Sequence, residues 1–236
     1  MCLKIFIYLV VLAIQISKLI SREIIFNPKP ISNIRVSDID NYTSFYQDVT
    51  EDNKWAFLTR IEGGFCVISL EDIQQPTLVN IVKAKGSYEI KLKNNYLFLS
   101  DLVEGLVIFD ITDPPNPKKI YTLATPITAQ SVTVTKDMKS LFLIASGTVY
   151  CYDISNIYNP TFLSKAGIYA PNTSKVKLDK NEQLLAVANH ISGLQIIDVR
   201  DRNNIKLRAT YLTGSSTWDS HFTPDISAIY AADAYF

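Results

Sequence analysis

Short apolar runs separated by polar turns make up most of the chain after its first 21 residues. Ile120–Leu123, Ser131–Thr135 and Leu141–Ala145 are examples, each about five residues long and rich in β-branched and aromatic side chains, as β-strands are. Lys136–Ser140, between two of them, has the length of a hairpin connector. Beyond the N-terminus, no window shows a long 3.6-residue hydrophobic period with helix caps. The pattern predicts an all-β chain.

One of these runs recurs. Gly105–Ile111 is an apolar strand that ends in Asp110 and is followed by Pro117. Three similar segments place a residue equivalent to Asp110 at positions 69, 153 and 198, so the intervals are 41, 43 and 45 residues. A period in this range indicates supersecondary units that pack against their neighbours. Four strands in about 43 residues is the composition of a β-propeller blade.

We therefore expect a β-propeller of about five four-stranded blades over residues 22–236. The last blade is incomplete or the ring is open, because the chain ends after the second strand of that blade. Either five blades close with one defective, or the sequence is a fragment of a longer propeller, which we favour. After an opening N-terminal strand, the expected repeats lie near 30–76, 77–117, 118–160, 161–205 and 206–236.

The segments Gly105–Ile111 and Gly193–Val199 resemble the LVIVD repeat, a propeller-forming motif of bacterial surface proteins and some eukaryotic ones. The resemblance extends over roughly residues 30 to 230. Three positions depart from it: Ser69 replaces an aspartate, Thr148 a glycine and Ile205 a proline. The resemblance implies a propeller fold and an exported location, and it supplies no catalytic motif.

The N-terminus has a different composition. Within residues 1–21, Lys4 precedes the apolar run Ile5–Ile14, which is long enough for a signal peptide and short for a membrane span. We expect a secreted or cell-surface protein that follows the secretory pathway. Contact with a membrane is expected only if the segment is kept as a signal anchor. Asn41-Tyr42-Thr43 and Asn172-Thr173-Ser174 are candidate glycosylation sites at Asn41 and Asn172.

The charge balance limits the kinds of partner to expect, and the positions of the cysteines limit the disulfides to expect. Basic and acidic residues are equal in number, 23 each, so nothing in the charge balance favours nucleic acid as a partner. A hydrophobic content of 47% in 236 residues is enough for a sizeable core. Cys66 and Cys151 lie in the third strands of different units and are expected to be buried free thiols.

A candidate ligand site is predicted at the start of the innermost strands, around the propeller axis. Five aligned positions there differ from unit to unit, as a binding surface would. Trp218 lies beside them and could add contact area. The alternative is a solvated channel without a ligand. The aligned residues are Asp48, Glu89, Ser131, Lys175 and Asp219.

Catalytic and metal-binding motifs have little support. Ser220 and His221 are adjacent on one strand and point to opposite faces, so they cannot form a catalytic pair. Asp110, Asp153 and Asp198 recur at equivalent positions in three of the units, which favours a structural role in the same turn over cation binding. We therefore assign no catalytic residue, no metal site and no cofactor.

The leading hypothesis for function is a non-enzymatic binding or adhesion module. Its ligand would be an unidentified protein, peptide or small molecule, bound at the loops or the axial mouth of a rigid scaffold. One alternative is a hydrolase of small substrates on a propeller scaffold. Another is a truncated, non-functional fragment of a larger propeller protein.

Overall fold

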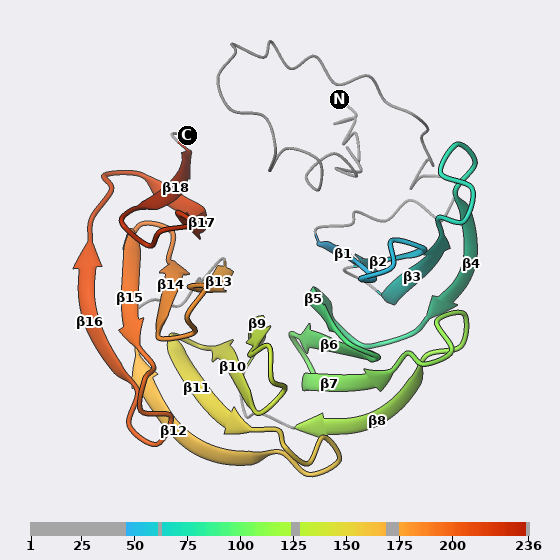
Figure 1. Cartoon of the computed structure of the whole chain (residues 1–236), viewed down its shortest axis with the longest axis horizontal. Helices are drawn as coiled ribbons and strands as arrows, with labels where there is room; N and C mark the ends of the chain where they lie inside the picture. The colour runs from blue at the N-terminus through green and yellow to red at the C-terminus, as the bar shows by residue number, and fades with distance from the viewer. Residues whose placement is uncertain (1–45, 61–62, 124–127, 169–174, 235–236) are drawn as a thin grey trace.

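The computed structural model describes residues 46–60, 63–123, 128–168 and 175–234. Within these ranges the chain forms four four-stranded antiparallel sheets and one two-stranded sheet, and no helix. The sheets fan out around a common axis (Figure 1). The prediction of an all-β propeller is confirmed.

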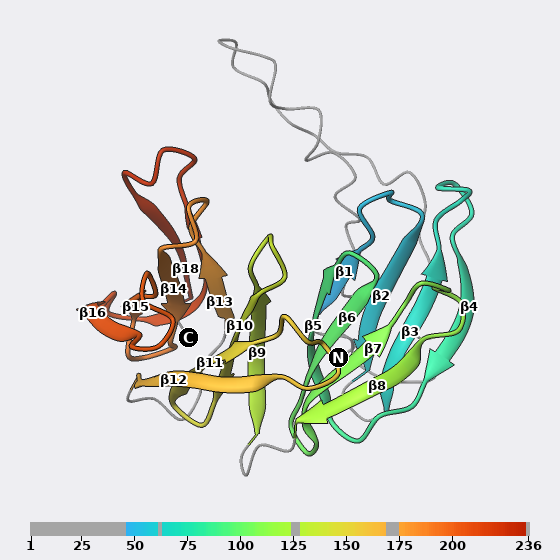
Figure 2. The same ribbon diagram turned by 60° about the horizontal axis from the view of Figure 1, so that its bottom comes forward.

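Each four-stranded sheet is a meander whose strands follow one another from the axis to the rim. β1, β5, β9, β13 and β17 are the innermost strands, and Figures 1 and 2 show the sheets side by side along an arc, with the first and fifth at its two ends. The strands are β1 (Gln47–Val49), β2 (Trp55–Arg60), β3 (Gly64–Ser69), β4 (Thr77–Val82), β5 (Ser87–Lys93), β6 (Tyr96–Asp101), β7 (Gly105–Asp110), β8 (Lys118–Leu123), β9 (Ala129–Val134), β10 (Ser140–Ala145), β11 (Thr148–Asp153), β12 (Thr161–Gly167), β13 (Lys175–Leu178), β14 (Leu184–Ala188), β15 (Leu194–Asp198), β16 (Lys206–Tyr211), β17 (Ser216–Phe222) and β18 (Ile229–Ala234).

The core fills the spaces between neighbouring sheets, because the second and third strands of each sheet are apolar on both faces. Between the first two sheets, the Phe65 ring meets the Phe109 ring edge to face, with centroids 5.1 Å apart. Each large side chain buried in this way contributes about 1.5–3 kcal/mol. The sheets therefore depend on one another for burial, as the period of the sequence predicts.

Glycines start the third strand where the chain passes close to the fourth. Gly193 has φ 72°, and a Cβ there would lie 2.1 Å from the carbonyl oxygen of Tyr211. In the third sheet, where Thr148 replaces the motif glycine, the preceding Ser146 and Gly147 have φ 42° and 71° instead. Two successive positive φ angles are typical of a tight hairpin turn, so the left-handed position has moved one residue earlier.

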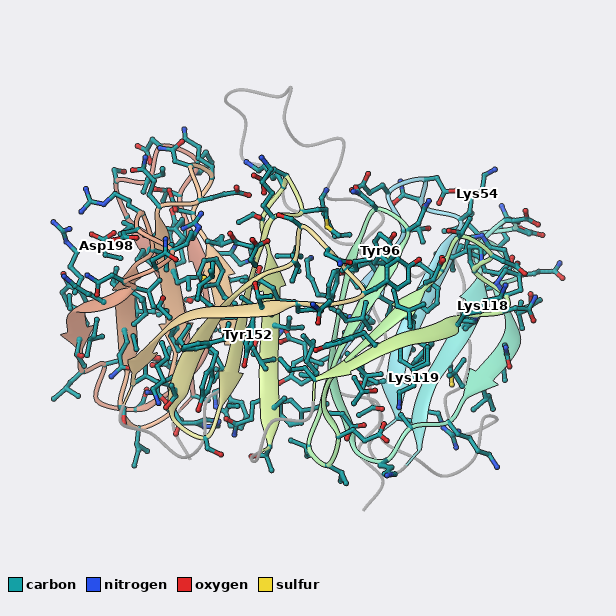
Figure 3. The ribbon with its side chains drawn as sticks, turned by 90° about the horizontal axis from the view of Figure 1, so that it is seen from below. Lys54, Tyr96, Lys118, Lys119, Tyr152 and Asp198 are labelled. Atoms are coloured by element: carbon teal, nitrogen blue, oxygen red, sulfur yellow. The ribbon has the colours of Figure 1, made fainter. Side chains whose placement is uncertain are left out.

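The aspartates that end the third strands lie in equivalent turns. Asp110, Asp153 and Asp198 each accept a hydrogen bond from the amide two residues later, at 2.8, 2.8 and 3.2 Å. These bonds lower the pKa of Asp110, while bonds from the Ser155 side chain and amide lower that of Asp153. At Asp198 the Arg200 guanidinium is the main cause of a lowered pKa. Figure 3 shows Asp198 at the periphery, away from the axis.

Some expectations fall outside the described residues. These are the N-terminal segment 1–21, the opening strand and the candidate glycosylation sites Asn41 and Asn172. Cys66 and Cys151 are buried, as expected, and burial raises the pKa of Cys151 to about 12. Among the residues that are described, no helix is long and apolar enough to cross a membrane.

Candidate active site at the propeller axis

The pairing between first and second strands aligns two sets of side chains around the axis. Residues two apart on a strand point to the same face, so the two sets lie one above the other. The second axial ring, paired with equivalent positions of the second strands, consists of Asp48, Lys91, Thr133, Lys177 and His221. The first axial ring, two residues earlier on each strand, consists of Tyr46, Glu89, Ser131, Lys175 and Asp219.

This register corrects one alignment made from the sequence. Asp48 pairs with Phe57, as Lys91 pairs with Phe98, so Asp48 belongs to the second ring. Tyr46, whose carbonyl accepts a hydrogen bond from the Thr59 amide, holds the position equivalent to Glu89. The sequence alignment was shifted by two residues because positions 46 and 48 lie on the same face of the strand and fit the same alternating pattern.

Glu89 and Ser131 link three sheets. The Ser131 hydroxyl donates a short hydrogen bond to Glu89 Oε2, which also accepts one from the Val132 amide at 3.2 Å. The Ser131 oxygen accepts in turn from the amide of Val176 at 3.1 Å. The innermost strands have a sheet partner on one side only, so amides directed away from that partner need another acceptor. Here a side chain of the preceding sheet provides it.

Asp48 makes the corresponding link between the first and second sheets. Its Oδ2 accepts hydrogen bonds from the Leu92 amide at 2.8 Å and from Lys91 Nζ at 3.1 Å. The axial aspartate predicted as a ligand contact therefore holds neighbouring strands together and neutralises a lysine. Its charge is already engaged within the protein.

Lys175 and Tyr46 meet across the axis. Lys175 Nζ lies 3.6 Å from Asp219 Oδ2 and 4.7 Å from the centre of the Tyr46 ring. The Tyr46 ring also packs against Tyr88, with centroids 5.2 Å apart. Burial, the Tyr88 hydrogen bond and the nearby carboxylates raise the pKa of Tyr46. Of the predicted site residues, Lys175 and Asp219 are thus brought together.

A β-bulge recurs at the start of the innermost strands. The register of β5, β9 and β17 shifts at Tyr88, Gln130 and Trp218, so each of these residues is an extra one in its strand. Trp218, 40% exposed, packs edge to face against His190 with centroids 4.3 Å apart. Bulges often re-aim side chains beside active sites. Here the bulge at Tyr88 brings an aromatic ring against Tyr46 of the first axial ring.

Besides Tyr46, three groups of the axial rings have shifted pKa values. Burial raises the pKa of Glu89, which is 8% exposed. Desolvation lowers the pKa of Lys177, and neighbouring Lys175 adds to the effect. Partial desolvation and then the positive charge of Lys177 lower the pKa of His221. Such a concentration of perturbed groups is characteristic of functional sites.

Sequence reasoning did not select Lys91 or Lys177, and it set His221 aside. The signal was available, because Lys91, Lys177 and His221 each lie two residues beyond a selected residue on a strand. Within the described ranges, no group of three or more His, Cys, Asp or Glu side chains is arranged to hold a metal ion.

The fold and the axial cluster define a β-propeller with polar and ionisable side chains at its centre. The LVIVD repeat family model matches residues 86–125, which span the whole second sheet, so the resemblance seen in the sequence is confirmed. No protein of curated function matches the chain in sequence.

Solved structures show the same fold at low identity. The periplasmic gluconolactonase of Pseudomonas aeruginosa matches with a TM-score of 0.70 and 13% identity over 80% of this chain and 63% of its own. A protein of Lactobacillus plantarum gives 0.72 and 14% over 80% and 64%. A candidate 6-phosphogluconolactonase of Bacteroides uniformis gives 0.68 and 12% over 80% and 64%. The chain thus spans less than two thirds of each of these structures.

These comparisons correct the leading hypothesis from the sequence. The interpretation as a non-enzymatic binding or adhesion module is contradicted, because three of the similar propellers are named as lactonases. The alternative, a small-substrate hydrolase on a propeller scaffold, agrees better with them.

Proposed function

We propose that the protein hydrolyses small lactones at its axial site. The observation that carries the proposal is the cluster of ionisable groups with shifted pKa values on the innermost strands, Glu89, Lys177 and His221. The named lactonases among similar propellers supply the substrate class.

His221 is the general base of the proposed reaction. Its lowered pKa keeps the imidazole neutral at neutral pH, so the ring can accept a proton from water. The water oxygen adds to the lactone carbonyl carbon as the proton passes to His221. When the ring C–O bond breaks, the imidazolium returns that proton to the leaving alkoxide, and the product is an open-chain hydroxy acid.

Lys175 stabilises the negative charge of the tetrahedral intermediate. Asp219 and the Tyr46 ring hold its ammonium group in place, which gives a positioned cation and not a mobile one. Positioned charges of this kind contribute most where the site excludes water. Trp218, beside the cluster, offers an aromatic surface for the ring of the substrate.

Acid release from three substrate types tests the proposal. The purified chain is assayed on glucono-δ-lactone, a nitrophenyl ester and a nitrophenyl glucoside, with spontaneous hydrolysis subtracted. We expect turnover of the lactone, a loss of about 10²–10⁴-fold in His221→Asn, and full activity in Lys165→Met on the rim strand β12. Absence of lactone turnover, or equal rates in wild type and His221→Asn, would overturn the proposal.

A further inference from the structure

Three lysines belong to the axial rings, and one of them differs from the other two. Lys91 is paired with Asp48 at 3.1 Å, and Lys175 with Asp219 at 3.6 Å. The ammonium group of Lys177 has no hydrogen bond or ion pair to any residue within the described ranges. Its ammonium group is the unpaired charge of the cluster.

The nearby carboxylates are already engaged. Asp219 holds Lys175 and also accepts a hydrogen bond from the Ser220 amide through Oδ1. Glu89 Oε2 accepts from Ser131 and Val132. Both carboxylates act on Lys177 electrostatically, but neither forms a contact with it. The ammonium group of Lys177 is therefore available to a further negative group.

An unpaired, half-buried ammonium lowers the stability of a protein, since desolvation disfavours the charged form. Burial is the main cause of the lowered pKa of Lys177. On a solvated outer strand the same lysine would cause no such loss. Lys177 instead lies on the innermost strand β13, two residues from Lys175 and on the same face.

We propose that Lys177 anchors an anion-binding site that takes the carboxylate or phosphate group of a small ligand. The anion forms a charge-assisted hydrogen bond with Nζ and supplies the counter-charge that the protein does not. The site lies beside His221, so a ligand held there has its uncharged part next to the proposed base. The inference goes beyond lactone hydrolysis and rests on the proposed function only for the choice of probes.

Calorimetric titration of the full chain tests the inference without any turnover. The probes are inorganic phosphate, gluconate and 6-phosphogluconate, with uncharged sorbitol as the comparison. The proteins are wild type, Lys177→Met, Lys177→Arg and Lys165→Met, whose lysine is exposed on the rim. Thermal melting of each variant establishes that it is folded.

We expect wild type and Lys165→Met to bind at least one anion and not sorbitol. Lys177→Met should bind it about tenfold or more weakly, the effect of losing one charge-assisted hydrogen bond, and Lys177→Arg should recover part of the affinity. Tighter binding of 6-phosphogluconate than of gluconate identifies phosphate as the group held, and equal binding identifies the carboxylate.

Equal affinity in wild type and Lys177→Met, or no anion binding by wild type, would overturn the inference. Its failure is separate from that of the proposed function. Lactone turnover without Lys177-dependent anion binding would contradict only the anion site, and such binding without turnover would contradict only the hydrolase.

Discussion

The ammonium group of Lys175 lies 4.7 Å from the centre of the Tyr46 ring, although one residue begins β13 of the fourth sheet and the other precedes β1 of the first. Side chains from distant parts of the chain therefore meet at the axis. The same region holds Asp219 and His221 of the fifth sheet. Basic, acidic and aromatic side chains from different sheets therefore lie close together at the axis.

Ser131→Ala should destabilise the protein. The substitution removes the hydroxyl that joins Glu89 to Val176 and leaves the Val176 amide without its acceptor. The expected loss in free energy of unfolding is about 1–3 kcal/mol, the cost of an unsatisfied buried group. Urea unfolding measures it, with Ser155→Ala in an exposed turn as the control. Equal losses in the two variants would show that the axial link has no special role.

Glu89→Gln should remove part of the dependence of stability on pH. Because burial raises the pKa of Glu89, its contribution is fully present below the unfolded-state pKa and is lost as pH rises through the folded-state pKa. Glutamine keeps an acceptor for Ser131 without ionising. We expect the free energy of unfolding to fall less between pH 4 and pH 8 in the variant than in wild type. Parallel curves in urea unfolding would contradict this.

Ile226→Asn should stabilise the protein. Ile226 has φ 63°, a left-handed conformation that a β-branched residue adopts only under strain. The equivalent turn of the first sheet has Asn53, with φ 59°. We expect a gain of roughly 1 kcal/mol, in line with the strain of the left-handed region, measured as a higher midpoint of unfolding. A lower midpoint would mean that the side chain of Ile226 contributes more by packing than its backbone loses by strain.

Trp218→Ala should raise KM for a lactone with little change in kcat. Trp218 is partly exposed beside the cluster and is not itself an acid or base, so its loss removes contact with the substrate. An aromatic contact of 0.5–1.5 kcal/mol corresponds to a roughly two- to tenfold change in KM. Steady-state kinetics distinguish this from a fall in kcat alone, which would contradict a binding role.

The sequence was sufficient for the strands and their order. The repeat of Gly105–Asp110 and the alternation around it predict the meander of each sheet, since each unit must bury the same apolar strands. The turn at Ser146 and Gly147 could not be foreseen from the motif, because a glycine one residue earlier meets the same backbone requirement.

The axial site was only partly predictable. Alternation along a strand identifies which residues share a face, and the comparison of repeats aligned Lys175 with Asp219, whose side chains lie 3.6 Å apart. It does not reveal a bulge, which changes the register of β5, β9 and β17 without any Gly or Pro signal. Nor does alternation show which charges are paired. Lys91 forms an ion pair with Asp48, whereas Lys177 forms none within the described residues.

The pH dependence of kcat/KM for glucono-δ-lactone, in wild type and in His221→Gln, tests the central claim most directly. Because the base must be neutral, the account predicts that kcat/KM rises with pH through the lowered pKa of His221, with the midpoint of the rise below the ordinary value of about 6.5 for histidine. In His221→Gln this rise should be absent and the rate lower by about 10²-fold or more. The same profile and rate in both proteins would contradict an active site at the propeller axis.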